Sequence, residues 1–132
     1  MAEYKTVVLE FIDAINRADT DAIERLMTDD HVFIDSAGYT YQGKDVMKKS
    51  WLNYFNMFPD YRIETVDITQ NKSVVGIFGF ASGTYKGKRN KKDSNYYRID
   101  AAWKAVVRKG RIAHWQIYCE SKKPEEIVAR NA

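Results

Sequence analysis

Apolar residues in the first part of the chain recur every three or four positions, which is the spacing of one face of an α-helix. Over residues 4–18 this spacing predicts a helix, and over residues 19–27 a second, shorter one. A third helix is predicted from about residue 43 to residue 57, and Pro59 ends it. The first half of the chain is therefore predicted to be mainly helical.

After Pro59 the pattern changes to the alternation of apolar and polar residues that is typical of β-strands. Strands are predicted at residues 61–70, 73–85, 95–108 and 111–120. The residues between the last two strands, Lys109-Gly110, favour a two-residue hairpin turn. Three shorter pieces complete the prediction: a strand at 31–35, a connecting loop at 36–42 and a helix from Pro124 to residue 129.

Helices followed by a run of long strands predict an α+β fold with one antiparallel sheet over residues 61–120. We expect the first and third helices to pack on its concave side. Gly76, Gly79 and Gly83 lie within one predicted strand, where glycines mark bends or bulges of a curved sheet. The length predicts a single domain over residues 1–132.

The last hairpin allows its sheet faces to be assigned from the sequence. If Arg108 pairs with Arg111, side chains at paired positions share a face, and a single bulge would exchange part of the assignment. The face predicted to line a pocket contains Asp100, Ala102, Lys104, Trp115, Ile117 and Cys119. The face predicted to be outside contains Ala101, Trp103, Ala105, His114, Gln116 and Tyr118.

Charge and composition exclude several classes of partner and chemistry. The net charge is only +3, and much of the excess lies in residues 86–92, which are predicted to be a solvated hairpin tip. We therefore expect no nucleic-acid or membrane partner. The chain has no apolar run that could span a membrane and no signal-peptide pattern, so a cytoplasmic location is expected. No spacing of ligands predicts a metal site, and no cofactor is expected.

Local sequence resembles the nuclear transport factor two-like superfamily. Residues 8–14 (VLEFIDA) and 110–115 (GRIAHW) look like the limonene-epoxide hydrolases, and residues 57–60 (MFPD) look like SnoaL-type polyketide cyclases. The segment 29–35 (DDHVFID) is similar to the steroid isomerases, in which its last Asp is the general base. The resemblance implies a cone-shaped, cystatin-like roll whose curved sheet wraps the helices around a deep apolar cavity.

The same resemblance suggests catalytic residues. It matches Asp35 to the base of the steroid isomerases and Asp100 to their second, hydrogen-bonding acid. Those enzymes have a tyrosine where this chain has Phe11, so one donor is missing, although Tyr54 could supply another hydroxyl. Alternatively, Asp35 initiates a turn and Asp100 forms an ion pair. The epoxide hydrolases need an Arg and an Asp near Gly79 and Ala81, so their reaction is not expected.

The candidate ligand-binding residues are mostly aromatic, and each could instead belong to the plain core. They are Phe11, Ile15, Phe33, Trp51, Tyr54, Phe55, Phe58, Trp115, Ile117 and Cys119. His31 is expected to be a surface or capping group, and His114 an interface residue. Cys119 is the only cysteine, which excludes an internal disulfide.

Two functions follow as hypotheses. The first is a cofactor-free isomerase or cyclase that acts on an apolar or polycyclic carbonyl compound by Asp acid–base chemistry. The second is a non-catalytic ligand-binding or assembly module of the same fold. In both cases we expect a homodimer through the outer sheet face, formed by Trp103, His114, Gln116 and Tyr118.

Overall fold

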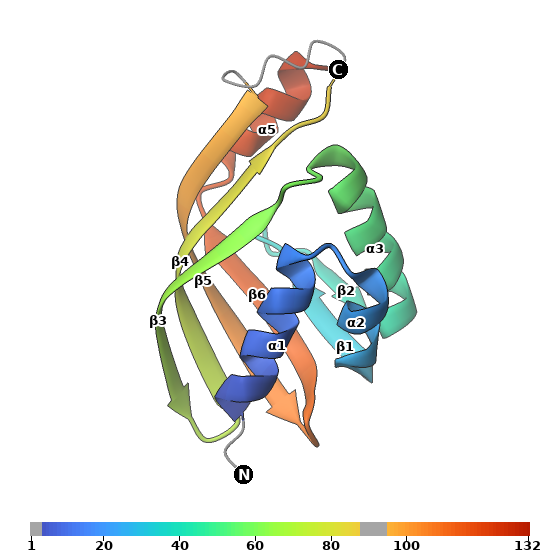
Figure 1. Ribbon diagram of the computed structural model, residues 1–132, viewed down its shortest axis with the longest axis vertical. Coiled ribbons are helices and arrows are strands. Elements are labelled where there is room, and N and C mark those ends of the chain that lie inside the picture. Colours follow the sequence, from blue (N-terminus) through green and yellow to red (C-terminus); the bar gives the residue numbers. More distant parts are fainter. Residues whose placement is uncertain (1–3, 88–94) are drawn as a thin grey trace.

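The computed structural model describes residues 4–87 and 95–132 (Figure 1). Its elements are α1 (Tyr4–Asn16), α2 (Thr20–Arg25), β1 (Met27–Ile34), β2 (Thr40–Gln42), α3 (Lys44–Met57), β3 (Arg62–Asn71), β4 (Val74–Thr84), β5 (Tyr96–Arg108), β6 (Arg111–Cys119) and α5 (Lys122–Arg130). The predicted α+β fold is confirmed. Most of the basic stretch predicted to form a hairpin tip lies outside the described residues. None of the described helices is long and apolar enough to cross a membrane.

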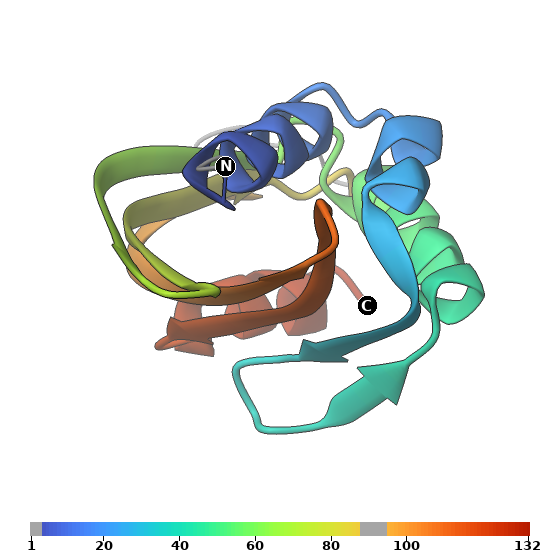
Figure 2. The same ribbon diagram turned by 90° about the horizontal axis from the view of Figure 1, so that it is seen from below.

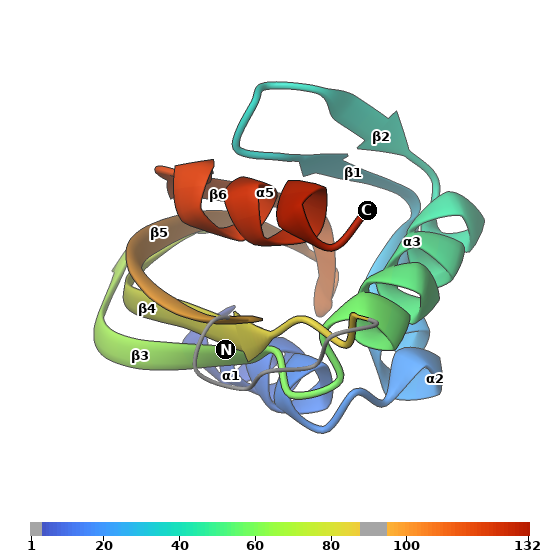
Figure 3. The same ribbon diagram turned by 90° about the horizontal axis from the view of Figure 1, so that it is seen from above.

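The six strands form one sheet in the order β2-β1-β6-β5-β4-β3. Strands β3 to β6 pair antiparallel, as predicted for residues 61–120. Strand β1 pairs parallel with β6 and antiparallel with β2, a strand in the segment predicted to be only a loop. Figures 2 and 3, viewed from the two ends of the molecule, show the sheet curving into a trough with α1 and α3 along its open side.

Helix α1 closes one part of this trough with the apolar face that its sequence spacing predicts. Its buried residues are Val8, Phe11, Ile12, Ala14 and Ile15. Phe11 is fully buried, and its ring meets the ring of Trp115 edge-on, with centroids 5.0 Å apart. Burying such large rings supplies much of the hydrophobic stabilisation of a domain of this size.

The last residue of α1 also contacts the edge of the sheet. The side-chain amide of Asn16 donates to the carbonyl oxygen of Ile63 at 3.0 Å, and its carbonyl oxygen accepts from the Ile63 N–H at 2.8 Å. Ile63 lies in β3, the strand at one end of the sheet order. One side chain therefore satisfies both backbone groups of an edge residue, as a neighbouring strand would.

A bulge at Val66 bends strand β3 where it passes Gly79 of β4. The pairing shifts between Thr65 and Asp67. A Cβ atom on Gly79 would lie 1.8 Å from the carbonyl oxygen of Glu64, which is a backbone atom and cannot swing away. Glycine is therefore required at this position, and the predicted link between a strand glycine and sheet curvature holds here.

A second bulge, in β6, corrects the sequence-based assignment of sheet faces. Arg108 pairs with Arg111 as predicted, but the register shifts between Val106 and Val107, so Val106 pairs with His114. Ala113 is the extra residue, and both Ile112 and Ala113 are buried. Beyond this point the residues of β6 lie on their predicted faces of the sheet. The residues of β5 lie on the opposite faces from those predicted, because their pairing with β6 is shifted by one residue.

The outer face of the sheet consequently differs from the prediction. Trp103 is buried and points to the inside, so its predicted outer position was wrong. His114, Gln116 and Tyr118 lie outside, and the His114 Nε2 atom is 3.2 Å from the Gln116 side-chain oxygen. About half of the Tyr118 side chain is exposed, and Phe78 is similarly exposed. Both rings flank Ala102 in one cross-strand row.

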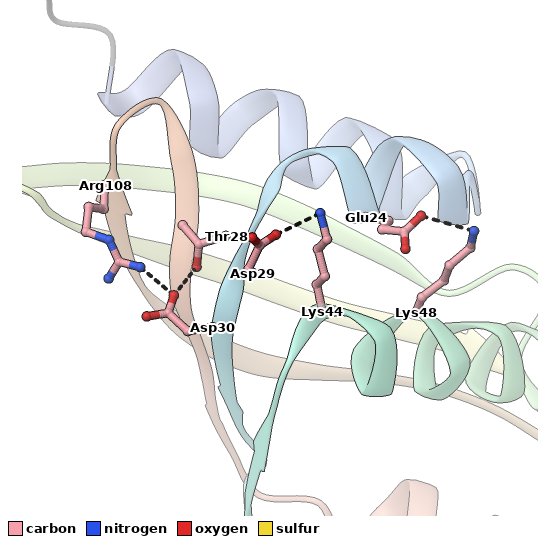
Figure 4. Close-up of polar contacts among 7 residues, drawn as sticks. All are labelled: Glu24, Thr28, Asp29, Asp30, Lys44, Lys48 and Arg108. Carbon is pink, nitrogen blue, oxygen red and sulfur yellow. Dashed lines mark hydrogen bonds and ion pairs between the residues drawn. The ribbon is translucent and has the colours of Figure 1, made fainter.

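Helix α3 is held against the neighbouring elements by ion pairs and by a hydrogen-bonded carboxylate at its end. Lys44 and Lys48 of α3 pair with Asp29 and Glu24, and Figure 4 shows both pairs beside the Arg108–Asp30 pair, which joins β5 to β1. Just beyond the helix, the carboxylate of Asp60 accepts two hydrogen bonds of 2.7 Å from the backbone N–H and the hydroxyl of Thr84. Exposed pairs contribute little stability individually, but together these contacts join α3 to α2, β1 and β4.

Candidate functional site

A cavity of about 670 Å³ lies between the concave side of the sheet, α3 and α5. Figure 3 shows α5 on the other side of the trough from α3. The volume is within the range of small-molecule sites. Its lining is rich in aromatic residues: Phe33, Tyr41, Trp51, Tyr54, Phe58, Tyr61, Tyr97, Trp103 and Trp115. All three tryptophans of the chain are therefore in its wall.

Helix α3 contributes one wall through residues spaced three, four and seven positions apart. Trp51, Tyr54 and Phe58 line the cavity, with Met47 one turn earlier. The Tyr54 and Phe58 rings stack with centroids 5.0 Å apart, and Trp51 meets Tyr54 at 87°. Because each ring is fixed by its neighbours, this wall is preorganised for an apolar ligand.

The sheet contributes the opposite wall from the inward positions of β5 and β6. On β6 these are Trp115, Ile117 and Cys119, the positions proposed from the sequence. On β5 they are Tyr97, Ile99 and Trp103 rather than Asp100, Ala102 and Lys104. None of these three was predicted to line the cavity, because the bulge in β6 exchanges the faces of β5.

Two tyrosine hydroxyls meet at the cavity wall. The Tyr54 and Tyr97 hydroxyl oxygens are 3.0 Å apart, so one donates to the other. Burial raises the pKa of Tyr54 to about 12 and raises the pKa of Tyr97 further. Tyr61 packs edge-on to Tyr54, and burial raises the pKa of Tyr61 well above its usual value. All three phenols are therefore neutral at physiological pH and able to donate hydrogen bonds.

Asp35 is half-buried at the cavity, where β1 turns towards β2. One carboxylate oxygen accepts the backbone N–H groups of Ala37 and Tyr39, each at 3.0 Å. The other accepts the Tyr41 hydroxyl at 3.1 Å. Asp35 therefore has the turn-forming role considered from the sequence and also lines the cavity.

Asp100 lies on the other side of the sheet. It is exposed, pairs with Phe80 of β4, and is absent from the cavity lining. The expectation that Asp35 and Asp100 share one cavity was wrong, because the β6 bulge turns Asp100 outwards. A mechanism that requires both carboxylates in one site is therefore excluded in this conformation.

Three other candidates are buried without lining the cavity. Phe11 and Ile15 are fully buried residues of the α1 face, and Phe55 stacks on Trp51 with centroids 5.5 Å apart. They belong to the core that supports the site. Helix periodicity marks residues as buried, but it does not separate a packed face from the edge of a cavity.

The C-terminal helix lines the cavity, although none of its residues was predicted to belong to the site. Helix α5 was predicted, but not its position, and it contributes Pro124, Glu125, Val128 and Ala129 to the lining. Its far end is fixed because the Asn131 side-chain amide donates to the Asn95 side-chain oxygen at 3.1 Å. The amphipathic pattern of the helix was the available signal.

Cys119 and the two histidines have separate environments. Cys119 is half-buried in the cavity wall, and burial raises the pKa of its thiol, against the effect of a hydrogen bond with Ser36. His31 is fully buried, not a surface group as expected, and neither histidine lines the cavity. Among the described residues no group of three or more His, Cys, Asp or Glu side chains could hold a metal ion.

Comparisons with solved structures agree with this architecture. A proposed SnoaL-like polyketide cyclase from Shewanella denitrificans superposes with a TM-score of 0.82 at 12% identity, covering 98% of this chain and 99% of the other. A proposed polyketide cyclase from Xanthomonas campestris gives 0.80 at 18% identity, covering 98% and 97%. A hypothetical protein from Catenulispora acidiphila with a ketosteroid isomerase-like fold, crystallised with trimethylamine, gives 0.79 at 17% identity, covering 95% and 91%.

These low identities establish the fold alone. No curated protein matches the chain. The sequence profile of the SnoaL-like domain, however, matches residues 8–115, which include β1 to β5, the first half of β6 and most of the cavity wall. The chain therefore belongs to the SnoaL-like domain family.

Proposed function

We propose that this protein binds one small, largely apolar molecule in the cavity and holds an oxygen atom of that molecule with the hydroxyl of Tyr54. The observation that carries the proposal is the Tyr54–Tyr97 hydroxyl pair in a wall that is otherwise mostly aromatic and aliphatic. Ligand sites commonly have this composition, with a few polar groups that fix the orientation of an apolar ligand.

The direction of the hydroxyl pair follows from burial. Tyr97 is only 2% exposed, whereas Tyr54 is less deeply buried. We assign Tyr97 as the donor to the Tyr54 oxygen, which leaves the hydrogen of Tyr54 for a ligand. A donor that itself accepts a hydrogen bond is polarised and donates more strongly. Because both phenols are neutral, the ligand group that fits is an acceptor such as a carbonyl oxygen.

A second candidate function is proton transfer on such a carbonyl compound, as in a cyclase or isomerase. Asp35 lines the same cavity as Tyr54. The Asp35 carboxylate would accept a proton from the carbon next to the carbonyl, while Tyr54 would stabilise the oxyanion that forms. Tyr54 would thus supply the donor that is missing at Phe11, and no role remains for Asp100.

Binding is tested with a ketone and its hydrocarbon analogue, 2-decalone and decalin. The three indole N–H signals in a ¹⁵N NMR spectrum report on the cavity wall. We expect 2-decalone to shift these signals and Tyr54→Phe to weaken its binding roughly fivefold to tenfold, the effect of one hydrogen bond. Tyr118→Phe, on the outer face, is the matched control. Equal binding of 2-decalone by wild type and Tyr54→Phe would contradict the role of Tyr54.

Proton transfer is tested separately, by exchange of the α-hydrogens of 2-decalone in D₂O. If Asp35 is a base, the wild type accelerates exchange and Asp35→Asn loses roughly a hundredfold or more of that acceleration. Asp100→Asn should leave the rate unchanged. No acceleration over buffer, with binding retained, would reject the enzyme and leave the binding function.

A further inference from the structure

We propose that the cavity selects a protonated amine carried on an apolar, ring-shaped body, with the amine at the end of the cavity that Asp35 and Glu125 line. The inference rests on the proposed binding function and adds the charge of the ligand. It depends on the charges of the lining residues, their lack of counter-ions and the aromatic rings beside them.

All the formal charge in the described cavity wall is negative. Asp35 and Glu125 line the cavity, and no lysine, arginine or histidine does so among the described residues. The whole chain, by contrast, has three more basic than acidic side chains. The wall therefore departs from the average composition in the direction that attracts cations.

Neither of these two carboxylates has a basic partner among the described residues, whereas several other acids of the molecule do. Asp29, Asp30 and Glu24 each form an ion pair with a lysine or arginine (Figure 4). In the part of the chain that the structure describes, neither Asp35 nor Glu125 is within ion-pair distance of a basic side chain. Their negative charge is therefore available to a ligand.

The Asp35 carboxylate is already oriented. Three hydrogen bonds, from Ala37, Tyr39 and Tyr41, fix it without adding a positive charge. A carboxylate offers about four acceptor positions, so one remains for an ammonium group. Glu125 accepts one hydrogen bond of 2.6 Å, from Ser121, and keeps further acceptor positions free.

Aromatic rings beside Asp35 favour the same ligand charge. The Phe33 and Tyr41 rings lie 6.0 Å apart at this end of the cavity, and their faces attract cations. Cys119 on the sheet wall lies near one of the two acids: burial is the main cause that raises the pKa of its thiol, a hydrogen bond with Ser36 opposes this, and the charges of Glu120 and Glu125 add to the rise. Among the described residues that line the cavity, an anionic ligand would meet two carboxylates and no cation.

Three ligands that share one ring system test the inference: 1-adamantanamine, 1-adamantanol and 1-adamantanecarboxylate. They absorb little light near 280 nm, so the fluorescence of the cavity tryptophans can report their binding. In wild type we expect the amine to bind roughly tenfold or more tightly than the carboxylate, with the alcohol between them. The preference should shrink at high salt, because the charges lie near solvent.

Glu125→Gln and Asp35→Asn should each reduce the preference for the amine, and the double variant should abolish it. Asp35→Asn should fold because Asn keeps an acceptor oxygen for the turn. Glu125→Gln should fold because Glu125 lies on an exposed helix surface. Thermal melts verify that both variants are folded. Asp100→Asn, an exposed acid on the other sheet face, is the matched control and should change nothing.

The outcomes separate this inference from the proposed function. If the alcohol binds and the amine has no advantage over the carboxylate, or keeps its advantage in the double variant, the charge selection is wrong and the binding function stands. If none of the three ligands binds although 2-decalone does, the charge selection is also wrong. If neither the three ligands nor 2-decalone binds, the charge selection and the proposed binding function are both wrong.

Discussion

The buried histidine of the core leads to a defined dependence of stability on pH. His31 is fully buried, and its Nδ1 atom lies 2.7 Å from the carbonyl oxygen of Ile112. Since a carbonyl only accepts, Nδ1 carries the hydrogen, and Nε2 has no partner among the described residues. Burial is the main cause that lowers the pKa of His31 from its ordinary 6.5, against the effect of the Ile112 hydrogen bond.

The sign and size of the effect follow from this lowered pKa. Above pH 6.5 His31 is neutral in the folded and unfolded chains, so its titration does not lower the free energy of unfolding. Below pH 6.5 the unfolded chain binds a proton first, and the free energy of unfolding falls until the pH reaches the folded pKa. The slope in this window approaches about 1.4 kcal/mol per pH unit. The carboxylates of Asp19, Asp30 and Glu64, whose pKa values are lowered mainly by hydrogen bonds, lose their contributions only at more acidic pH.

Urea denaturation at several pH values between 8 and 5 measures this slope. His31→Asn keeps a donor near the Nδ1 position but cannot titrate, so its stability, lower throughout, should be flat over this range. The chain has one other histidine, His114, and His114→Gln should retain the wild-type slope. A flat wild-type profile, or a slope that follows His114, would refute the reasoning.

Two further predictions concern the sheet. Gly79→Ala should lower the free energy of unfolding, measured by urea denaturation, by about 2–3 kcal/mol or more, because its Cβ would overlap the Glu64 carbonyl oxygen. The control is Gly76→Ala, whose Cβ would meet a movable side chain. An equal loss of stability in both variants would contradict this explanation. We also expect a homodimer through the outer sheet face, which sedimentation at tens of micromolar should detect. Phe78→Arg should weaken the dimer, whereas Leu52→Arg on α3 should not. A monomeric wild type would count against this interface.

The sequence predicted the fold well because hydrophobic periodicity is a local property. The helices α1 and α3 and the four long strands each carry enough repeats for their type to be read directly. The parallel pairing of β1 with β6 joins residues about eighty positions apart in the chain, and no local pattern encodes it. The short β2 strand depends on that neighbour, so it was missed as well.

The candidate site was harder to predict because a cavity depends on register. At Ile112-Ala113 the two residues are both apolar and both buried, and neither is a glycine that would mark a bulge. One extra residue there moved Asp100 to the outside and brought Tyr97 and Trp103 to the inside. On helix α3, which has no such freedom, the predicted Trp51 and Tyr54 line the cavity, as does Phe58 directly after the helix, whereas the predicted Phe55 is packed in the core.

The contact between Asn16 and Ile63 has a consequence for how these molecules meet one another in concentrated solution. An unpaired strand edge can template the addition of a strand from another copy, which is a common start of aggregation. Here the amide of Asn16 occupies the hydrogen-bonding groups of Ile63 on β3, and the opposite edge, β2, is only three residues long. Both edges of the sheet therefore discourage the addition of a strand from another copy. Replacing Asn16 by an apolar residue would leave the backbone groups of Ile63 unpaired at the edge.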